Sequence, residues 1–453
     1  MRIIAKLAKW LLALLVVAVV AGGAWLHFST PALIRGALAY SAKMVCSYQF
    51  IAGRDTQEVL ARDVHEPAAH WLLRYISAAS DHDERAITTR LFGVLGEGRA
   101  VHRDGFGCVT VPQGSTVAAM TPPVPATADK DALWLQGERV ELSQDAELQS
   151  LLTDEALVGP GMRAVVIVRD GRIVAERYGT GFSADTPLLG WSMTKTITAA
   201  IIGTLIKDDR LSLEQDGLFE EWSGDERSAI TVADLMAMSS GLAFNEDYGG
   251  LTDVTRMLYL EPDMAAFAAG MPLTSGPGET FSYSSGSTAM LSRVWQDVFA
   301  GPQEAALYPQ EALFTPLGMS SAVLEADASG TFVGSSYLYA SARDWARFGE
   351  FLRNDGVWEG AQLLPAGFVD WMRQAAPASN GAYARGHMWL QGPGEGSNEA
   401  HGLPADTFWL RGHDGQSVAI IPSRGLVIAR LGLTPSRLGY QPQRLVKSVI
   451  DAL

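Results

Sequence analysis

The chain has 453 residues, of which 47% are hydrophobic and 19% are charged. A chain of this length buries a large core and exceeds one ordinary domain, so we expect one large domain and an additional part. The formal net charge of −15 at pH 7 and the absence of a Lys/Arg cluster exclude nucleic acid as the expected partner, because such a partner requires a basic patch.

Residues 1–30 form the first predicted part, a membrane or targeting segment. Arg2, Lys6 and Lys9 precede an almost unbroken apolar run. About 19 apolar residues are enough to cross a bilayer as a helix, and basic residues before such a run stay in the cytoplasm. We therefore expect an uncleaved anchor and an exported remainder. A cleavable signal ending near Ala24 is the alternative, because "VVAGGA" offers small residues.

Residues 31–130 form a second part, for which the sequence indicates no function. The segment combines a helix-like stretch at 56–76 with a strand-like stretch at 86–95. Cys46 and Cys108 are the two cysteines of the chain, and we expect a disulfide between them in an oxidising compartment. Closing that loop would stabilise the fold by on the order of 4 kcal/mol in the chain-entropy model. Two buried free thiols are the alternative.

A Pro- and Ala-rich stretch at 120–134 indicates a linker or a long surface loop, and we place the last domain at 131–453. Two β-rich runs surround "DG" at 170–171, a strong hairpin signal, and a second hairpin is predicted to turn at 422–425. Helical sequence lies between the hairpins. We therefore expect an α+β domain whose antiparallel sheet takes its strands from distant parts of the chain.

A serine and a lysine begin the helix-forming run at 193–206. The three-residue step from Ser192 to Lys195 places both on one helix face, where a hydroxyl meets an amine. A serine hydroxyl is a poor nucleophile until a base takes its proton, and lysine is that base only when neutral. Burial among Trp191 and Ile197 would favour the neutral amine. A serine at a helix start also offers its own N–H to an oxyanion.

Two further motifs follow this pair in the order and spacing of a known family. The triplet "YSS" at 283–285 precedes a helix-forming run, and "HDG" at 413–415 precedes a predicted strand. Together with S-x-x-K, they resemble the class C β-lactamase-like serine hydrolases, whose second motif starts with tyrosine. "ITVADLMAMSSGL", "LFTPLGM" and "SSYLYASARDWARFG" are similar to family segments as well. The resemblance covers about 160–435. It implies the β-lactamase and penicillin-binding-protein fold, with an antiparallel sheet flanked by helices and an all-helical subregion.

The resemblance implies a catalytic role for the matching residues. Ser192 would be the acylated nucleophile and Lys195 the group that activates it. Tyr283 would relay a proton toward the leaving group. The backbone N–H groups of Ser192 and Gln416 would form the oxyanion hole.

Three other positions would bind substrate. His413 takes the place of the family's lysine and would meet the polar or acidic end of the substrate. Gly415 would let the substrate approach the backbone closely. Ser285 stands where β-lactamases carry asparagine. The changes at His413 and Ser285 reduce the contacts expected for a β-lactam and resemble the esterase and amidase branch, including the 6-aminohexanoate-dimer (nylon oligomer) hydrolases.

These features predict an exported serine hydrolase that cleaves small or short peptide-like esters or amides through an acyl-enzyme, without a metal or cofactor. The histidine spacing near the C-terminus fits no metal motif. The expected location is the bacterial inner membrane, with the catalytic domain in the periplasm or outside the cell, or free secretion if the signal is cleaved. One alternative is a β-lactamase or D-Ala-D-Ala peptidase of the same fold. The other is an inactive cell-envelope binding protein, which would be expected to have lost Ser192, Lys195 or Tyr283.

Overall fold

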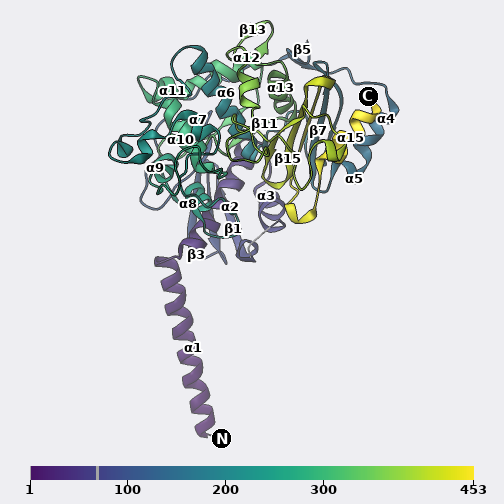
Figure 1. The fold of residues 1–453 in the computed structure, drawn as a ribbon. Helices are drawn as coiled ribbons and strands as arrows, with labels where there is room; N and C mark the ends of the chain where they lie inside the picture. Colours follow the sequence, from purple (N-terminus) through teal and green to yellow (C-terminus); the bar gives the residue numbers. More distant parts are fainter. Residues whose placement is uncertain (1, 68–70) are drawn as a thin grey trace. The chain divides into compact units, whose positions relative to one another are not determined.

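The computed structural model describes residues 2–67 and 71–453, which form two compact units (Figure 1). Unit 1 contains the N-terminal segment and two later pieces of the chain. Unit 2 contains most of the remainder. Unit 1 comprises Met1–His102, Cys108–Thr116 and Asp247–Pro262, and unit 2 comprises Arg103–Gly107, Val117–Glu246 and Asp263–Leu453.

The two units do not follow the predicted domains 31–130 and 131–453, since Arg103–Gly107 and the residues from Val117 to 130 belong to unit 2 and Asp247–Pro262 belongs to unit 1. Helix α8 (Asp253–Leu260) belongs to unit 1, because it packs against α2 (Ala32–Phe50). The whole predicted linker at 120–134 belongs to unit 2, where the Thr121 N–H donates to the Gln303 side-chain oxygen at 3.1 Å. Both differences come from contacts between distant segments, which composition does not encode.

Unit 1 begins with α1 (Arg2–Phe28), which is long and apolar enough to cross a membrane over Ile3–Trp25. A signal sequence near the N-terminus has the same length and composition, so α1 fits either predicted role. The rest of unit 1 is a four-stranded sheet with helices α2, α3 and α8. The sheet follows the order β1-β2-β3-β4, with β1 (Ile76–Asp81), β2 (Ala86–Leu91), β3 (Leu95–Arg103) and β4 (Gly107–Thr110).

The sheet of unit 1 packs closely on α2. The Thr89 hydroxyl of β2 donates to the Leu38 carbonyl of α2 at 2.8 Å. Gly98 of β3 has no room for a side chain, because a Cβ there would lie 2.4 Å from the Leu38 carbonyl carbon.

The strand-like stretch predicted at 86–95 forms β2 and the turn after it. The predicted helix at 56–76 is broken into α3 (Thr56–Val59), a π-helical turn (Leu60–His65) and a 3-10 turn (Trp71–Tyr75), with residues 68–70 outside the described part.

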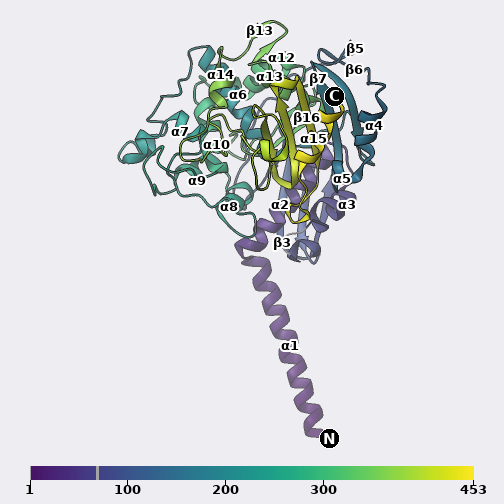
Figure 2. The ribbon, with the colours of Figure 1, turned by 45° about the vertical axis from the view of Figure 1, so that its right-hand side comes forward.

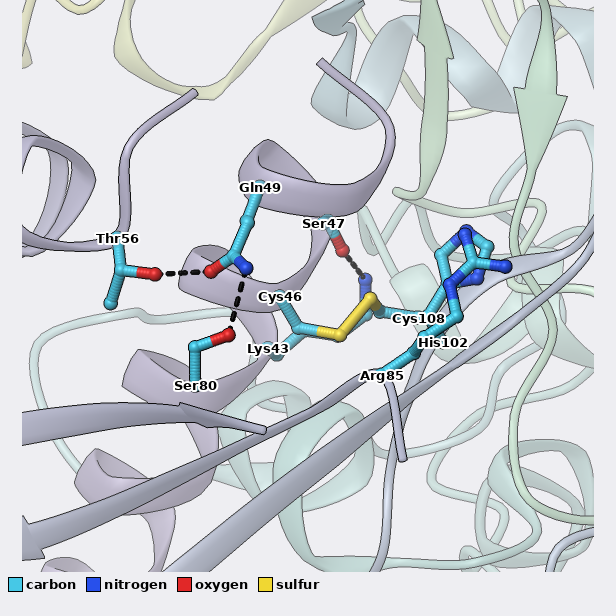
Figure 3. The surroundings of a disulfide bond; sticks show 9 residues. All are labelled: Lys43, Cys46, Ser47, Gln49, Thr56, Ser80, Arg85, His102 and Cys108. Atoms are coloured by element: carbon cyan, nitrogen blue, oxygen red, sulfur yellow. Dashed lines mark hydrogen bonds between the residues drawn. A yellow bond between two sulfur atoms is a disulfide. The ribbon is translucent and has the colours of Figure 1, made fainter. Parts of the chain in front are cut away.

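The predicted disulfide is present and joins Cys46 of α2 to Cys108 of β4 (Figure 3). Beside it, Lys43 donates to the Ser47 hydroxyl at 2.8 Å. The carboxamide of Gln49, further along α2, donates to the Ser80 hydroxyl of β1 at 2.8 Å. The bond and these contacts tie α2 to both ends of the sheet.

Unit 2 is built around a five-stranded antiparallel sheet with the order β14-β15-β16-β7-β8. The first three strands come from the C-terminal end of the chain and the other two from before the Ser192 motif, as predicted (Figure 2). Asp170 and Gly171 turn the first hairpin with φ of 47° and 74°, the left-handed pair that a two-residue turn requires. The strands are β7 (Met162–Arg169), β8 (Arg172–Tyr178), β14 (Phe408–Gly412), β15 (Gln416–Ile421) and β16 (Leu426–Gly432).

Helices cover both faces of this sheet. On one face α13 (Ala342–Arg353) approaches so closely that a Cβ on Gly349 would lie 2.6 Å from Val427 and 3.0 Å from Val418. The alternate residues of the same strands, such as Ala419 and Ile428, pack in a core with three helices of the other face. Those helices are α4 (Ala146–Thr153), α5 (Glu155–Val158) and α15 (Pro442–Ala452).

The residues between β8 and β14 form the predicted helical subregion and several small strand pairs. Its central helices α6 and α10 are almost entirely buried and pack against each other. The fold is therefore the predicted α+β class. Besides α13, the helices of unit 2 between β8 and β14 are α6 (Thr194–Lys207), α7 (Val232–Met236), α9 (Met264–Ala269), α10 (Ser285–Gln296), α11 (Pro302–Pro309), α12 (Thr315–Leu317) and α14 (Phe368–Met372). The short strands of unit 2 are β5 (Asp129–Leu133), β6 (Gly137–Arg139), β9 (Leu188–Leu189), β10 (Val323–Leu324), β11 (Leu338–Ala340), β12 (Val357–Trp358) and β13 (Ala361–Gln362).

Candidate active site

Ser192 lies in a tight 3-10 turn (Trp191–Met193) that leads directly into α6. The preceding Trp191 is buried and has a φ of 49°, a left-handed conformation that bulky residues rarely adopt. Gly190 has no room for a side chain, because a Cβ there would lie 2.1 Å from the Trp345 ring. The turn is therefore held in a strained conformation by packing, as is common where a reactive side chain must be presented.

Lys195 meets Ser192 as the three-residue spacing predicts. Its Nζ lies 3.1 Å from the Ser192 Oγ, 3.0 Å from the Ser285 Oγ and 2.9 Å from the Ser335 carbonyl oxygen. The lysine is 0% exposed. All three neighbours are neutral oxygen groups, so the amine is surrounded by hydrogen-bond partners and not by a direct counterion.

The hydrogen-bond pattern around the amine favours Ser192 as the proton donor. A carbonyl only accepts, so the Ser335 oxygen takes one lysine N–H. The Ser285 hydroxyl donates its proton to the Glu246 carboxylate at 2.5 Å and therefore accepts from the lysine. A neutral amine has two N–H groups and one lone pair, and these two acceptors use both N–H groups. The lone pair is left for the Ser192 hydroxyl.

The protonation of Lys195 is set by burial and by one acid. Burial lowers the pKa of Lys195 to about 8, against the opposing effect of the Glu246 carboxylate. With that pKa, about one lysine in ten is neutral at pH 7, compared with roughly one in a few thousand for an unperturbed lysine. The site thus supplies a usable base near neutral pH.

Glu246 is a site residue that the sequence did not predict. Its two carboxylate oxygens accept from Ser285, one from the backbone N–H at 2.7 Å and one from the hydroxyl. Because both oxygens accept, the ionised form fits the site. Burial raises the pKa of Glu246, and Lys195 is the largest opposing influence. The acid lies in "FNEDYGG", 39 positions before Ser285, where Asn245 and Asp247 flank it, so the local sequence offers no signal that distinguishes it from other acids.

Tyr283 packs beside the lysine within a group of aromatic rings. The Lys195 Nζ lies 5.0 Å from its ring centroid, and the rings of Tyr383 and Trp389 lie 5.6 Å and 5.4 Å away. Burial and then the Glu246 charge raise the pKa of Tyr283, while a hydrogen bond with Ser192 and the charge of Arg411 lower it. The tyrosine therefore stays protonated at neutral pH. A protonated tyrosine can donate a proton but cannot accept one as a base.

Arg411 is a second charged residue beside Tyr283 that the sequence did not predict. Its guanidinium carbon lies 4.1 Å from the centroid of the Trp389 ring, the same ring that packs on Tyr283. Burial lowers the pKa of Arg411 to about 10, and the two neighbouring tyrosines, Tyr283 and Tyr383, oppose this shift. The charge of Arg411 therefore favours the anionic form of Tyr283, in opposition to burial, which raises the pKa of Tyr283.

The late motif follows β14 and lies against the Ser192 turn. Gly412 approaches so closely that a Cβ there would lie 2.2 Å from the Gly190 carbonyl oxygen. His413 is 42% exposed, and its ring centroid lies 5.5 Å from that of Trp191. The motif is thus placed beside the nucleophile. Gln416 is the first residue of β15 and pairs with Gly412, so its backbone belongs to the strand end nearest the turn.

Two predicted substrate-binding residues have protein partners in the structure. Gly415 has a φ of 83°, and a Cβ there would lie 3.0 Å from Thr434. A turn conformation and close packing therefore explain this glycine without a substrate. Ser285 is 0% exposed, and its hydroxyl links Lys195 to Glu246. The predicted contact of Ser285 with substrate stays a prediction.

Histidine chemistry plays no visible part at the nucleophile. His387 is buried, and its ring nitrogens lie 3.3 Å from the Thr288 hydroxyl and 3.3 Å from the Tyr383 hydroxyl. Burial, aided by the charge of Lys195, lowers the pKa of His387 to about 3. Within 2–67 and 71–453, no group of three His, Cys, Asp or Glu side chains is arranged to hold a metal ion.

Comparisons with known proteins agree with the fold and the motifs. The family model described as "Beta-lactamase" matches residues 154–437. A 6-aminohexanoate-dimer hydrolase from Paenarthrobacter ureafaciens is 25% identical over 277 residues, which cover 54% of this chain and 69% of that protein.

Two solved structures share the fold. A Bacillus anthracis protein provisionally named 6-aminohexanoate-dimer hydrolase has a TM-score of 0.55 and 24% identity, and the match covers 74% of this chain and 87% of that chain. A family VIII carboxylesterase has a TM-score of 0.53 and 15% identity, covering 70% of this chain and 99% of that chain. The family model spans more than half of the chain and includes the Ser192 turn, so the protein belongs to the Beta-lactamase family and is a hydrolase with the serine-hydrolase fold.

Proposed function

We propose that the protein cleaves ester or amide bonds through an acyl-enzyme on Ser192, with Lys195 as the base and Tyr283 as the proton donor to the leaving group. The observation that carries this proposal is the buried Lys195 amine, 3.1 Å from the Ser192 hydroxyl, whose other two polar neighbours accept hydrogen bonds. A lysine in that environment is a base directed at one hydroxyl.

In the proposed acylation step, Ser192 loses its proton and gains the acyl group of the substrate. The neutral Lys195 amine takes the Ser192 proton while the Oγ forms a bond to the carbonyl carbon of the substrate. The resulting oxyanion accepts from the backbone N–H groups of Ser192 and Gln416. The carbon–oxygen or carbon–nitrogen bond then breaks, and the leaving group takes the Tyr283 proton. Lys195, whose Nζ lies 5.0 Å from the centroid of the Tyr283 ring, returns the proton it took from Ser192 to the tyrosine.

Deacylation uses the same groups in the opposite direction. A water molecule takes the place of the leaving group, loses its proton to the neutral base and attacks the acyl carbon. Ser192 recovers its proton as the acid product leaves. Each cycle consumes one water and returns every side chain to its initial protonation state.

The environment of Ser285 supports linear esters and amides, in preference to β-lactams, as the substrates of the site. In β-lactamases the corresponding asparagine offers an amide to the substrate, whereas the Ser285 hydroxyl is already bonded to Lys195 and Glu246. The late motif carries His413, which lacks the permanent charge of the family's lysine. Losing a charge-assisted contact and a hydrogen bond costs roughly 2 to 4 kcal/mol, or about 30-fold to 1,000-fold in kcat/KM.

A substrate panel tests this proposal with the full-length chain purified in detergent and the Ser192→Ala variant as the blank. Short-chain p-nitrophenyl esters should be hydrolysed, linear amides should be the next substrates to examine, and a chromogenic cephalosporin should show at most weak turnover, because two contacts that favour a β-lactam are missing. Cephalosporin turnover faster than that of every ester and linear amide would identify a β-lactamase. No turnover of any substrate, D-Ala-D-Ala peptides included, would support the inactive binding protein.

A further inference from the structure

Unit 1 presents a group of large apolar side chains to solvent, which we name the aromatic patch. It consists of Trp71, Tyr75, Phe92 and Val94, which are 62%, 50%, 57% and 63% exposed. The ring centroids of Trp71 and Tyr75 lie 6.1 Å apart, and those of Tyr75 and Phe92 lie 5.2 Å apart. The Phe92 N–H also donates to the Tyr75 carbonyl at 2.9 Å, so the turn that carries Trp71 and Tyr75 lies against the hairpin that carries Phe92 and Val94.

Exposed apolar side chains are concentrated in this unit. Outside α1, the described residues include nine large hydrophobic side chains that are exposed, and six of them belong to unit 1. The other two in unit 1 are Leu33 and Leu251, which lie together at the first turns of α2, since a Cβ on Gly36 would meet Leu251 at 3.8 Å. Scattered exposed residues are normal on soluble proteins, whereas a concentrated group marks an interaction surface.

Phe92 is held at the tip of the β2–β3 hairpin in an unfavourable backbone conformation. Its φ is 53°, and Gly93 after it has a φ of 76°. Asparagine, aspartate and glycine adopt that conformation easily, whereas an aromatic residue there is an outlier. A strained residue that also exposes its ring to solvent contributes nothing to the core, so packing does not explain an aromatic side chain at this position, and a role at the surface does.

The hairpin tip lies beside the point where the chain leaves α1. A Cβ on Gly96, near the start of β3, would lie 3.1 Å from the Thr30 methyl group and 2.9 Å from Leu38. Both ribbon views show β3 next to the C-terminal end of α1 (Figures 1 and 2). Thr30 lies two residues after the end of α1, and Val94 lies two residues before Gly96. Two residues of chain span at most about 7 Å, so the end of α1 and Val94 each lie within that distance of Thr30 and Gly96, respectively.

We propose that the aromatic patch is a membrane-contacting surface that rests in the headgroup region of the bilayer that α1 crosses. The inference rests on α1 remaining attached as an anchor and not on the chemistry at Ser192. If α1 spans the hydrocarbon core, Thr30 emerges at the bilayer surface for any tilt of the helix, because the apolar run ends at Phe28. The hairpin tip beside it then lies at headgroup depth.

The chemistry of the patch fits a lipid surface. Tryptophan and tyrosine prefer the interface between hydrocarbon and water, where the ring is buried and the polar atom stays hydrated. Arg74 lies between Trp71 and Tyr75 in the same 3-10 turn and is exposed, as is Arg35 in α2, so lipid phosphates would find cations beside the rings. A second copy of the chain is the competing occupant, but it would not explain why the hairpin that carries Phe92 and Val94 lies beside the residues that follow α1.

Proteoliposomes test the proposal with the full-length chain carrying one added cysteine. The native cysteines form a disulfide, so a nitrobenzoxadiazole (NBD) probe attaches at Phe92→Cys or, in a second variant, at Tyr75→Cys. Val124→Cys is the matched control, since Val124 is 85% exposed and lies in unit 2. Probes at 92 and 75 should be quenched by lipids brominated close to the headgroup. Iodide quenching there should be weaker than at 124 by about threefold or more, as for a probe shielded by lipid.

Three outcomes would overturn the proposal. Iodide quenching at 92 and 75 equal to that at 124 would place the patch in water. Protection that disappears when the protein is diluted into excess lipid would identify a second copy as the occupant. Protein that does not float with the liposomes would remove the anchor on which the proposal depends. Fluorophosphonate labelling of the same samples reports the Ser192 chemistry separately, so failure of either proposal is distinguishable from failure of the other.

Discussion

Replacing Lys195 by alanine is expected to lower kcat/KM for a p-nitrophenyl ester by about 10²-fold to 10⁴-fold, the usual contribution of a positioned general base. The variant leaves Ser192 without the lone pair that accepts its proton. It also removes the donor to Ser285 and to the Ser335 carbonyl. Steady-state kinetics of the purified full-length chain measure the loss.

Lys207→Ala is the matched control for that substitution, because Lys207 lies at the end of the same helix and is exposed. It should retain wild-type kcat/KM. An unchanged thermal unfolding midpoint would show that the Lys195→Ala variant is folded, and partial recovery by added small amines would show that a base is missing. A folded Lys195→Ala variant with near wild-type kcat/KM would rule out lysine as the base.

The second large effect is expected in the pH dependence of kcat/KM. Only the neutral amine accepts the Ser192 proton, so the rate should follow the fraction of Lys195 that is neutral. That fraction exceeds one half above the lysine's pKa of about 8. Activity should therefore rise by about 50-fold between pH 6 and pH 8 and level off above pH 9. If a tyrosinate at Tyr283 were the base, the rate would continue to rise beyond pH 10, because burial raises the pKa of that tyrosine.

Glu246→Gln separates the influence of the acid from that of burial. The Glu246 carboxylate raises the pKa of Lys195, so its removal should lower that pKa further and move the rising limb to lower pH. The expected displacement is on the order of one pH unit, and it increases the fraction of maximal activity retained at pH 6. Glu279→Gln, an exposed acid upstream of Tyr283, should leave the limb in place. A limb that moves to higher pH in Glu246→Gln would contradict the assignment.

Features encoded within a few residues were predictable from sequence. The three-residue spacing alone predicts the contact between Ser192 and Lys195, because helix geometry fixes the separation. The hairpin at Asp170 follows from a dipeptide that adopts the left-handed conformation. The disulfide joins residues 62 positions apart, but it followed from the presence of only two cysteines in a segment that the sequence predicts to be exported.

The union of the two distant hairpins in one sheet was predicted, but the side-chain contacts between other distant segments were not. Glu246 reaches Ser285 across 39 positions, and the Ser335 carbonyl reaches Lys195 across 140. Both separations are longer than any helix or strand of unit 2, so only the folded topology brings these groups together. The assignment of residues 247–262 to unit 1 has the same origin, because α8 is placed by its packing on α2. The charge environment of the lysine, and hence its pKa, therefore emerged only from the structure.

The most direct test of the proposed mechanism is covalent capture of the nucleophile. The full-length chain is treated with a fluorophosphonate probe, and the modified peptide is located by mass spectrometry in the wild type, in Ser192→Ala and in Lys195→Ala. The adduct should be found on the peptide that contains Ser192. It should be absent from Ser192→Ala and should form far more slowly in Lys195→Ala. An adduct on another serine, or labelling that persists in Ser192→Ala, would contradict the account.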